Sequence, residues 1–289
     1  MRILLFLGVI GLCFSSCVKE IVPEFGPFEP KLVVNTRFGP DTTWQIHVSE
    51  NARITDPLNA PWVENANVVI RNEITGQSEI LDYSADGYYL STSSRPEVGQ
   101  QYTLDVQAPG FPNASSQSYV PEDFIIAVTD TSRGIFLNSF IYNVDVQIND
   151  NGDEDNYYFF ETYLVNNSGA DLFYSPLLQY AIDPNSENRE IGNLDQPFQR
   201  VYLPDRNFNG DSYVISLRIR PGFNIGSSTV QVRIFSASKA LYDYLKSYEA
   251  STAVSLDITF SEPIQVKTNI DGGLGIFGGY NQISTVIRF

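Results

Sequence analysis

Apolar and polar side chains alternate without interruption in the stretch Tyr102-Thr103-Leu104-Asp105-Val106-Gln107-Ala108. Successive side chains of a β-strand point to opposite faces, so this period of two predicts a strand with one buried face and one wet face. The same alternation occurs on both sides of this stretch, at residues 44–49, 66–71, 142–148, 213–219, 230–234 and 283–289. The chain is therefore predicted to be an all-β protein.

Turn-forming residues separate these segments and suggest two domains. The pairs that favour turns are Asp56-Pro57, Thr75-Gly76, Asp86-Gly87 and Pro109-Gly110. Short strands at this spacing, with no helical pattern between them, are typical of a β-sandwich. We therefore expect residues 31–121 to form an immunoglobulin-like or prealbumin-like β-sandwich. Residues 122–289 are expected to form a second, larger antiparallel β-sandwich.

One segment of the second domain has a helical period instead. Its apolar side chains recur at spacings typical of one helix face, at Ala237, Leu241, Tyr244, Leu245 and Tyr248. We predict a helix near residues 236–250 that packs on the sheet.

The first residues have the layout of a lipoprotein export signal. Met1-Arg2 is followed by an apolar run over residues 3–12 and by Ser15-Ser16, directly before Cys17. The run is about half of the ~20 residues that a membrane-spanning helix needs. We expect residues 1–16 to be removed and Cys17 to be lipidated, with an ordinary secretory signal as the alternative. Residues 17–30, which contain several prolines, are expected to form a tether.

Cysteine content and charge narrow the function classes further. Removal of residues 1–16 also removes Cys13, so the mature chain has no second cysteine for a disulfide or a thiolate metal site. The fold must then rest on its core, and 43% of the residues are hydrophobic. The formal net charge of −16 disfavours nucleic acid and anionic lipid head groups as partners, because both are negatively charged.

Few residues fit catalytic chemistry. His47 is the single histidine, and the alternation places it on the polar face of its strand. A Ser-His-Asp triad would need His47, and neither a Cys-His pair nor a multi-histidine zinc site can form in the mature chain. We predict no catalytic residue, no metal site and no cofactor. Acidic residues are abundant, so a glycan hydrolase with a carboxylate pair is an alternative that composition leaves open.

The glycine-rich segment near the C-terminus has a functional and a structural interpretation. Residues 273–278 spell G-x-G-x-x-G, but a dinucleotide site also needs a following helix and a distant acidic residue. The chain that remains after Gly278 is too short for both. We expect a tight loop that uses the freedom of glycine, with docking of a partner through Ile276 and Phe277 as the alternative.

Acidic and aromatic side chains gather in neighbouring segments. The turn at residues 149–156 is expected to be a solvated hairpin tip, with Ca²⁺ binding as the alternative, and contains Asp150, Asp153, Glu154 and Asp155. Aromatic rings can stack on sugars or anchor interfaces, but in a β-rich core they mostly fill space. We expect at least half of the following to be structural: Tyr157, Tyr158, Phe159, Phe160, Tyr163, Phe173 and Tyr174.

The C-terminal region resembles a known family. It reads Glu262-Pro263-Ile264-Gln265-Val266-Lys267-Thr268-Asn269-Ile270-Asp271-Gly272-Gly273-Leu274-Gly275-Ile276-Phe277-Gly278-Gly279, which is similar to the signature of Bacteroidota lipoproteins that contain a domain of unknown function. The lipoprotein cysteine Cys17 agrees with this resemblance, as do the segments at residues 66–102 and 205–210. The resemblance covers nearly the whole mature chain.

The resemblance implies a place of action and a partner. Such proteins resemble accessory lipoproteins that are encoded beside TonB-dependent outer-membrane receptors, and their N-terminal domain resembles the non-catalytic regulatory module of carboxypeptidases. Lys19-Glu20 partly resembles the signal for export to the cell surface, with a periplasmic orientation as the alternative. We therefore expect a lipid-anchored outer-membrane protein that faces the cell exterior and helps a receptor in nutrient capture. The rival expectations are a structural or adhesive surface protein and, less favoured, a glycan hydrolase.

Overall fold

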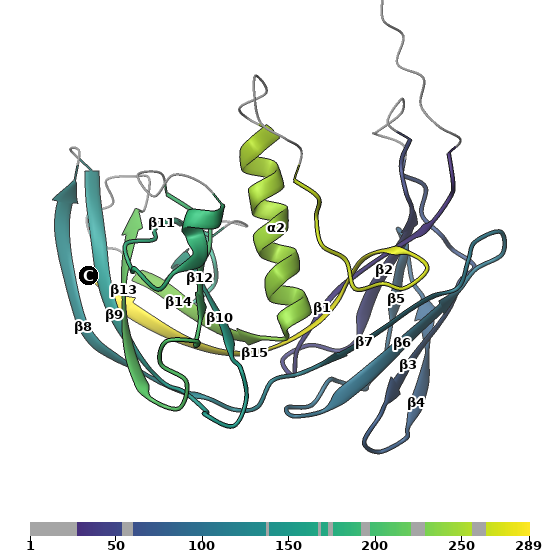
Figure 1. Ribbon diagram of the computed structural model, residues 1–289, viewed down its shortest axis with the longest axis horizontal. Coiled ribbons are helices and arrows are strands. Elements are labelled where there is room, and N and C mark those ends of the chain that lie inside the picture. The colour runs from purple at the N-terminus through teal and green to yellow at the C-terminus, as the bar shows by residue number, and fades with distance from the viewer. Residues whose placement is uncertain are drawn as a thin grey trace, which may run out of the picture.

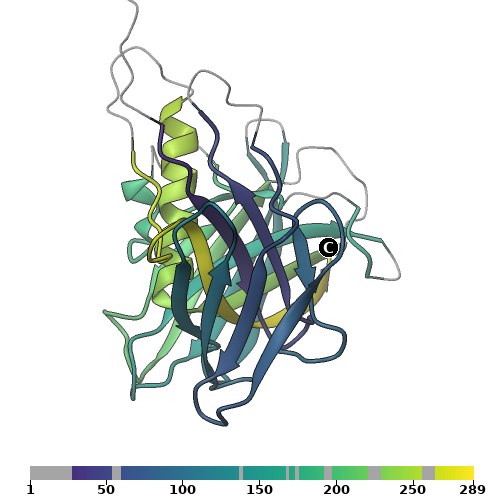
Figure 2. The same ribbon diagram turned by 90° about the vertical axis from the view of Figure 1, so that its right-hand side faces the viewer.

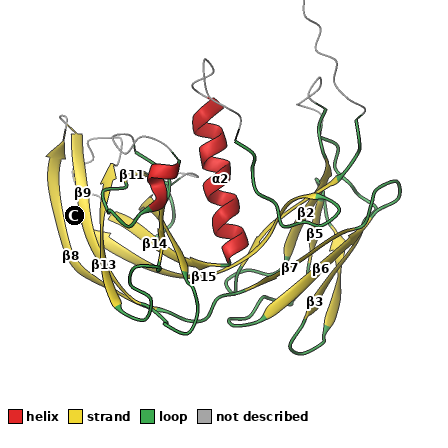
Figure 3. Ribbon diagram, viewed as in Figure 1, coloured by secondary structure: helices red, strands yellow, loops and turns green. Residues whose placement is uncertain are grey.

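The computed structural model describes residues 28–53, 60–136, 139–166, 169–172, 176–191, 197–220, 229–255 and 264–289. In this part of the chain large β-sheets form a sandwich-like fold with one α-helix, which confirms the predicted all-β class (Figures 1 and 3). No helix among these residues is both long enough and apolar enough to cross a membrane. The predicted signal at residues 1–16, Cys17 and most of the tether lie outside the described residues, as do Asp56-Pro57, Phe173 and Tyr174.

The N-terminal sandwich contains the stretch that predicts the fold. Tyr102, Leu104 and Val106 are buried, while Asp105 and Gln107 are exposed, so the predicted alternation is confirmed. The strands follow the order β1-β2-β5-β4-β3-β6-β7. Their bounds are β1 Leu32–Phe38, β2 Gln45–Glu50, β3 Asn67–Asn72, β4 Ser78–Tyr83, β5 Tyr88–Leu90, β6 Gln101–Gln107 and β7 Ala114–Tyr119.

The C-terminal sandwich has two sheets with an apolar core between them. One sheet has the order β12-β10-β14-β15, with β10 Tyr157–Val165, β12 Val201–Pro204, β14 Thr229–Ala237 and β15 Leu274–Arg288. The other has the order β11-β13-β9-β8, with β8 Ile125–Phe136, β9 Ser139–Asn149, β11 Leu178–Tyr180 and β13 Ser212–Arg220. A short 3₁₀ helix, η1, covers Glu187–Glu190.

Helix α2, Lys239–Ser255, packs on the outer face of the first of these sheets (Figure 1). It begins after Ser238, whose hydroxyl accepts a hydrogen bond from the Leu241 backbone N–H at 3.4 Å, as an N-terminal cap does. Leu241 is fully buried against the sheet, which confirms the predicted helix and its apolar face. Two assignments to that face were wrong. The Tyr248 side chain is 52% exposed and stacks on Tyr244 along the helix surface, and Ala237 is the last residue of β14.

Strand β15 connects the two sandwiches (Figure 1). Its first part, residues 274–279, pairs in parallel with β1, and its second part, residues 280–288, pairs with β14 in the antiparallel sense. Figure 2 shows β1 and β15 side by side behind the outer strands of the N-terminal sandwich. The expected division at residue 121 therefore leaves out a C-terminal strand on which the N-terminal sheet depends.

Candidate functional site

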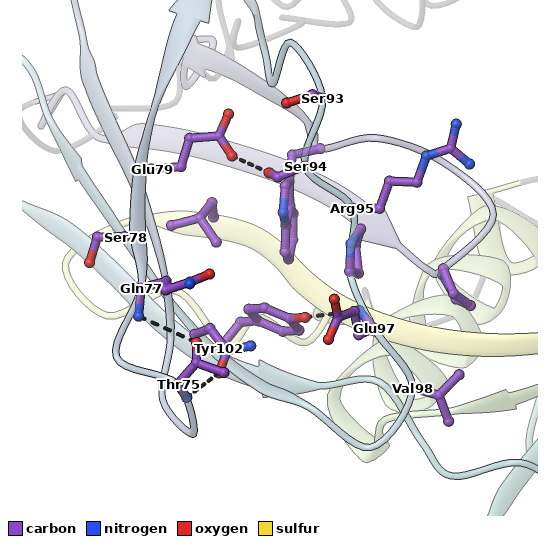
Figure 4. Close-up of a pocket in the computed structure, with 15 residues that line it drawn as sticks. Thr75, Gln77, Ser78, Glu79, Ser93, Ser94, Arg95, Glu97, Val98 and Tyr102 are labelled. Carbon is purple, nitrogen blue, oxygen red and sulfur yellow. Dashed lines mark hydrogen bonds between the residues drawn. The ribbon is translucent and has the colours of Figure 1, made fainter.

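A groove of about 930 Å³ opens at one end of the N-terminal sandwich (Figure 4). One wall is the β3–β4 turn, and the other is the loop between β5 and β6. Nine of its fifteen lining residues are polar or charged: Asn72, Thr75, Gln77, Ser78, Glu79, Ser93, Ser94, Arg95 and Glu97. Apolar side chains complete the lining, at Pro40, Trp44, Ile70, Pro96, Val98 and Tyr102.

The loop wall is held by Glu79 on β4. The Ser91 hydroxyl donates a hydrogen bond to Glu79 Oε1 at 2.7 Å, and the Ser94 hydroxyl donates to Oε2. Ser91 Oγ also accepts the backbone N–H groups of Ser93 and Ser94, at 3.2 and 2.9 Å. Such side-chain acceptors stabilise a tight turn, so one carboxylate and one hydroxyl together set the position of this wall.

The turn wall depends on Asn72 at the end of β3. Its Oδ1 accepts the backbone N–H groups of Ile74 and Thr75, both at 2.9 Å, which is how asparagine stabilises a turn. Its Nδ2 donates to Gln100 at 3.1 Å. Gly76 completes the turn with a φ of +72°, as expected for the predicted Thr75-Gly76 pair.

The floor of the groove is aromatic. Trp44 and Tyr102 pack edge to face with ring centroids 4.9 Å apart, and both are almost fully buried. The Tyr102 hydroxyl accepts the backbone N–H of Glu97 at 2.8 Å. Burial raises the pKa of Tyr102, so the phenol stays neutral at physiological pH. The floor therefore offers a rigid apolar surface with one hydroxyl.

The groove has the chemical features of a site for a polar organic molecule. Arg95 and Glu97 are exposed at its rim and carry opposite charges, and hydroxyl and amide groups surround the aromatic floor. Pockets that combine an apolar base with a few oriented polar groups are typical ligand sites. No binding site was predicted at these residues, because the β3–β4 turn and the β5–β6 loop come together only in the folded sandwich.

The groove lies far from the point where the chain enters the sandwich. Leu32, the first residue of β1, pairs with Glu50 at the end of β2, whereas Pro40 in the β1–β2 turn lines the groove. A strand as long as β1 covers about 23 Å at about 3.3 Å per residue. The groove and the segment that leads back to Cys17 are therefore at opposite ends of the sandwich.

Removal of the Glu79 carboxylate is expected to loosen the groove. In Glu79→Ala both serine hydroxyls lose their acceptor, and we expect a loss of about 1–2 kcal/mol in the free energy of unfolding. Amide hydrogen exchange at Ser93 and Ser94 should speed up because the turn they belong to loses its support. Glu97→Ala is the control, because it keeps the backbone N–H bond to Tyr102. Equal exchange in the two variants would contradict the role of Glu79.

His47 lies on the outer face of β2. It is half-buried, and its ring meets the Tyr88 ring edge to face with centroids 4.9 Å apart. The structure thus places the single histidine beside an aromatic side chain, on the face that the alternation predicts.

The glycine-rich segment is part of a strand, which corrects the expectation of a tight loop. β15 begins at Leu274, and Ile276 and Phe277 are 4% and 0% exposed, so neither is available on a surface loop. A Cβ on Gly275 or Gly279 would overlap the backbone carbonyl oxygen of Val34 or Tyr119. Glycine is needed because other strands approach β15 too closely for any side chain.

The acidic turn is not the predicted hairpin tip, because it connects β9 of one sheet to β10 of the other and these two strands do not pair. Asp153 and Asp155 are exposed, whereas Asp150 is used within the fold. Asp150 accepts hydrogen bonds from the Tyr158 hydroxyl at 2.6 Å and from the Gly210 N–H at 2.9 Å. Burial, together with the negative charges of Glu122 and Asp150, raises the pKa of Glu154. Among the described residues, no group of three or more histidine, cysteine or acidic side chains could hold a metal ion.

The aromatic run is core on both sides of its strand. Tyr158 and Phe160 face the opposite sheet, and Phe159 faces α2. All three are fully buried, and Tyr163 is 8% exposed. The burial of these rings confirms that they are structural. Both faces of β10 are buried, because α2 covers the face that the alternation would have exposed to solvent.

A buried ion network that the sequence patterns did not predict joins β10, the residue before β12 and α2. Arg200 donates from Nε to Glu161 and from Nη1 to Glu249, both at 2.7 Å. Arg37 adds a contact to Glu161 at 3.4 Å, and the Tyr163 hydroxyl donates to the same carboxylate at 2.7 Å. A glutamate inside the apolar run of β10 was the signal in the sequence, because a buried charge needs a partner.

The ion network shifts the pKa values of Glu161 and Glu249 in opposite directions. Burial acts to raise the pKa of Glu161, but the charges of Arg200 and Arg37 and the Tyr163 hydrogen bond outweigh it, and the pKa is lowered. Burial prevails at Glu249 and raises its pKa despite Arg200. Glu161 lies on β10 and Glu249 on α2, and both contact Arg200, so the ion network links α2 to the sheet.

Comparisons with known proteins place the chain in a family. No curated protein matches the sequence. A solved structure described as a putative carbohydrate binding protein from Bacteroides uniformis is similar at 11% identity, over 89% of this chain and 98% of that chain, with a TM-score of 0.20. Residues 18–285 match the family described as "Domain of unknown function (DUF4249)". The match covers most of the sequence, and the chain therefore belongs to the DUF4249 family.

Proposed function

We propose that this protein is a lipid-anchored binding protein of the outer membrane that acts as an accessory partner of a TonB-dependent receptor. Lipid on Cys17 attaches it to the membrane, and the body faces the cell exterior. In this role the groove of the N-terminal sandwich takes up a nutrient ligand, and the receptor imports it.

The position of the groove is the observation that carries this proposal. The chain enters the N-terminal sandwich at Lys31 and Leu32, and the groove opens at the other end. Residues 18–31 reach at most about 50 Å when extended, at about 3.5 Å per residue. With a tether of that length, the folded part of the protein remains close to receptors in the membrane. The groove then points away from the end of the sandwich at which the tether is attached.

Replacement of the lipidated cysteine tests the attachment. In Cys17→Ser the acyl chains have no thiol to occupy, so we expect the protein to leave the membrane fraction and to lose palmitate labelling. Protease treatment of intact cells should degrade the wild-type protein if it faces outward. Unchanged sedimentation of Cys17→Ser with membranes would contradict the anchor.

Affinity purification tests the partner. The tagged wild-type protein, extracted from membranes with detergent, should recover a large β-barrel receptor. The matched control is the Glu97→Lys, Arg95→Glu double variant, which exchanges the charges of the groove rim and leaves the anchor intact. It should still recover the receptor but should capture less ligand. Repeated recovery of the lipoprotein alone would count against the receptor partnership.

A further inference from the structure

A second surface of the N-terminal sandwich has features that the groove does not explain. On the outer face of β2 and β5 lie the side chains of His47, Trp62 and Tyr88, which we call the aromatic strip. Trp62 is 53% exposed and Tyr88 is 45% exposed. Outward positions on a sandwich are normally polar, so two exposed large rings on one face have no explanation in the core.

The strand register places these side chains in one row. His47 is paired with Tyr88, and Ser49, two residues further along β2, is bridged to Trp62. Residues two apart on a strand point to the same face, at a spacing of about 7 Å along the strand. The two exposed rings therefore follow the same line on the surface, with the His47 ring edge-on to Tyr88.

The local backbone is built around this row. Asp86 and Gly87 have φ values of +52° and +78°, and the Tyr88 N–H donates to the Ala85 carbonyl at 2.8 Å, as in a type I′ hairpin turn. A Cβ on Gly87 would lie 2.7 Å from the Val48 carbonyl oxygen, and also within 3.1 Å of His47 Nε2 and 3.3 Å of Trp62 Cβ. Glycine at this position lets the His47 imidazole and the Trp62 Cβ both lie close to the same point of the backbone.

The charges beside the strip favour one class of ligand. Glu64 and Asp86 are exposed and lie two residues from Trp62 and Tyr88, respectively. In a chain of net charge −16, they disfavour nucleic acid, anionic lipid and acidic polysaccharide. A neutral sugar presents an apolar C–H face that packs on aromatic rings, and its hydroxyl groups can donate to carboxylates. We propose that the aromatic strip is a binding site for neutral carbohydrate.

Tryptophan fluorescence can isolate this site, because the chain has two tryptophans. Trp44 is 2% exposed and Trp62 is 53% exposed, so acrylamide should quench mainly Trp62. The full lipoprotein is purified in a detergent without a sugar head group and titrated with dextran, laminarin, glucomannan or arabinoxylan. We expect at least one of these neutral polysaccharides to protect Trp62 from quenching, and acidic alginate to give no protection.

Two variants test whether the rings of Trp62 and Tyr88 bind the sugar. Trp62→Ala and Tyr88→Ala should each weaken retardation in a gel that contains the protecting polysaccharide by tenfold or more, because each removes one stacking surface. Tyr248→Ala is the matched control: its ring is 52% exposed but lies on α2, and binding should be unchanged. Because the altered side chains are exposed, all three variants should keep the wild-type melting temperature.

The alternative outcomes overturn the proposal. Protection by none of the four neutral polysaccharides, or by alginate alone, would show that the strip is not a site for neutral carbohydrate. Binding that survives both Trp62→Ala and Tyr88→Ala would place the sugar elsewhere. The assay contains no receptor and no membrane, so its failure leaves the receptor partnership to its own test.

Discussion

Replacement of Arg200 by alanine is expected to lower the free energy of unfolding by about 3–5 kcal/mol. Arg200 contacts Glu161, whose side chain is 1% exposed, and Glu249, whose side chain is 13% exposed. Without the guanidinium, the cation that stays in contact with Glu161 among the described residues is the more distant Arg37, at 3.4 Å. A buried carboxylate with a poor partner is strongly destabilising, and urea denaturation followed by circular dichroism measures the loss.

An exposed ion pair provides the control for this variant. Arg71 and Glu73 are 3.7 Å apart, and the Arg71 side chain is 58% exposed, so Arg71→Ala should cost less than about 1 kcal/mol. A second test measures the free energy of unfolding as a function of pH. The pKa of Glu161 is lowered in the folded protein, so its stabilising contribution is present above the ordinary carboxyl pKa and is lost as the pH falls through the lowered pKa. Arg200→Ala should therefore lose less stability on acidification than the wild type. A cost no greater than that of Arg71→Ala would show that Arg37 alone sustains Glu161.

Gly279→Ala is expected to destabilise the protein by about 3 kcal/mol or more, because a side chain there has no space. A Cβ would overlap the Tyr119 carbonyl oxygen and lie 2.9 Å from Phe38 Cε2. Gly279 is the last residue of β15 that pairs with β1, and Tyr280 is the first that pairs with β14. The methyl group would push apart strands at the junction of the two sandwiches, and faster limited proteolysis should accompany the lower stability.

Gly76→Ala separates this effect from a general cost of losing glycine. Gly76 has a φ of +72°, but a Cβ there would have nothing within 4 Å. The variant should lose only the roughly 1–2 kcal/mol that a left-handed backbone costs an ordinary residue. If both variants were equally stable, close packing around Gly279 would not be the reason for its glycine.

Local patterns predicted the strands and the helix well. Each alternating segment reports which of its side chains are buried, and Tyr102, Leu104 and Val106 are buried as expected. The Asp86-Gly87 turn is also as predicted, because positive φ values favour these residue types. The loop expected at residues 273–278 was wrong because glycine permits two opposite solutions. It can relax a turn, or it can let another backbone approach a strand.

The candidate site could not be predicted from these local patterns. The groove combines Asn72 at the end of β3, Glu79 on β4 and Ser94 in the β5–β6 loop, and nothing in the spacing of these residues brings the loop to the two strands. The same holds for the aromatic strip, because Trp62 and Tyr88 are aligned only by the pairing of both with β2. Glu161 was visible as a charge in an apolar run, but its partner Arg200 was not.

The sequence by itself determined the class of the fold, the positions of most strands, the helix and the faces that are buried. These properties depend on residues that are close in the sequence, because the period of two in a strand and of 3.6 in a helix can be recognised within a single element. The tertiary structure alone decided that β15 serves both sandwiches, that two walls enclose the groove and that Arg200 lies between two carboxylates. A period reveals which face an element buries but carries no information about which distant strand will cover it.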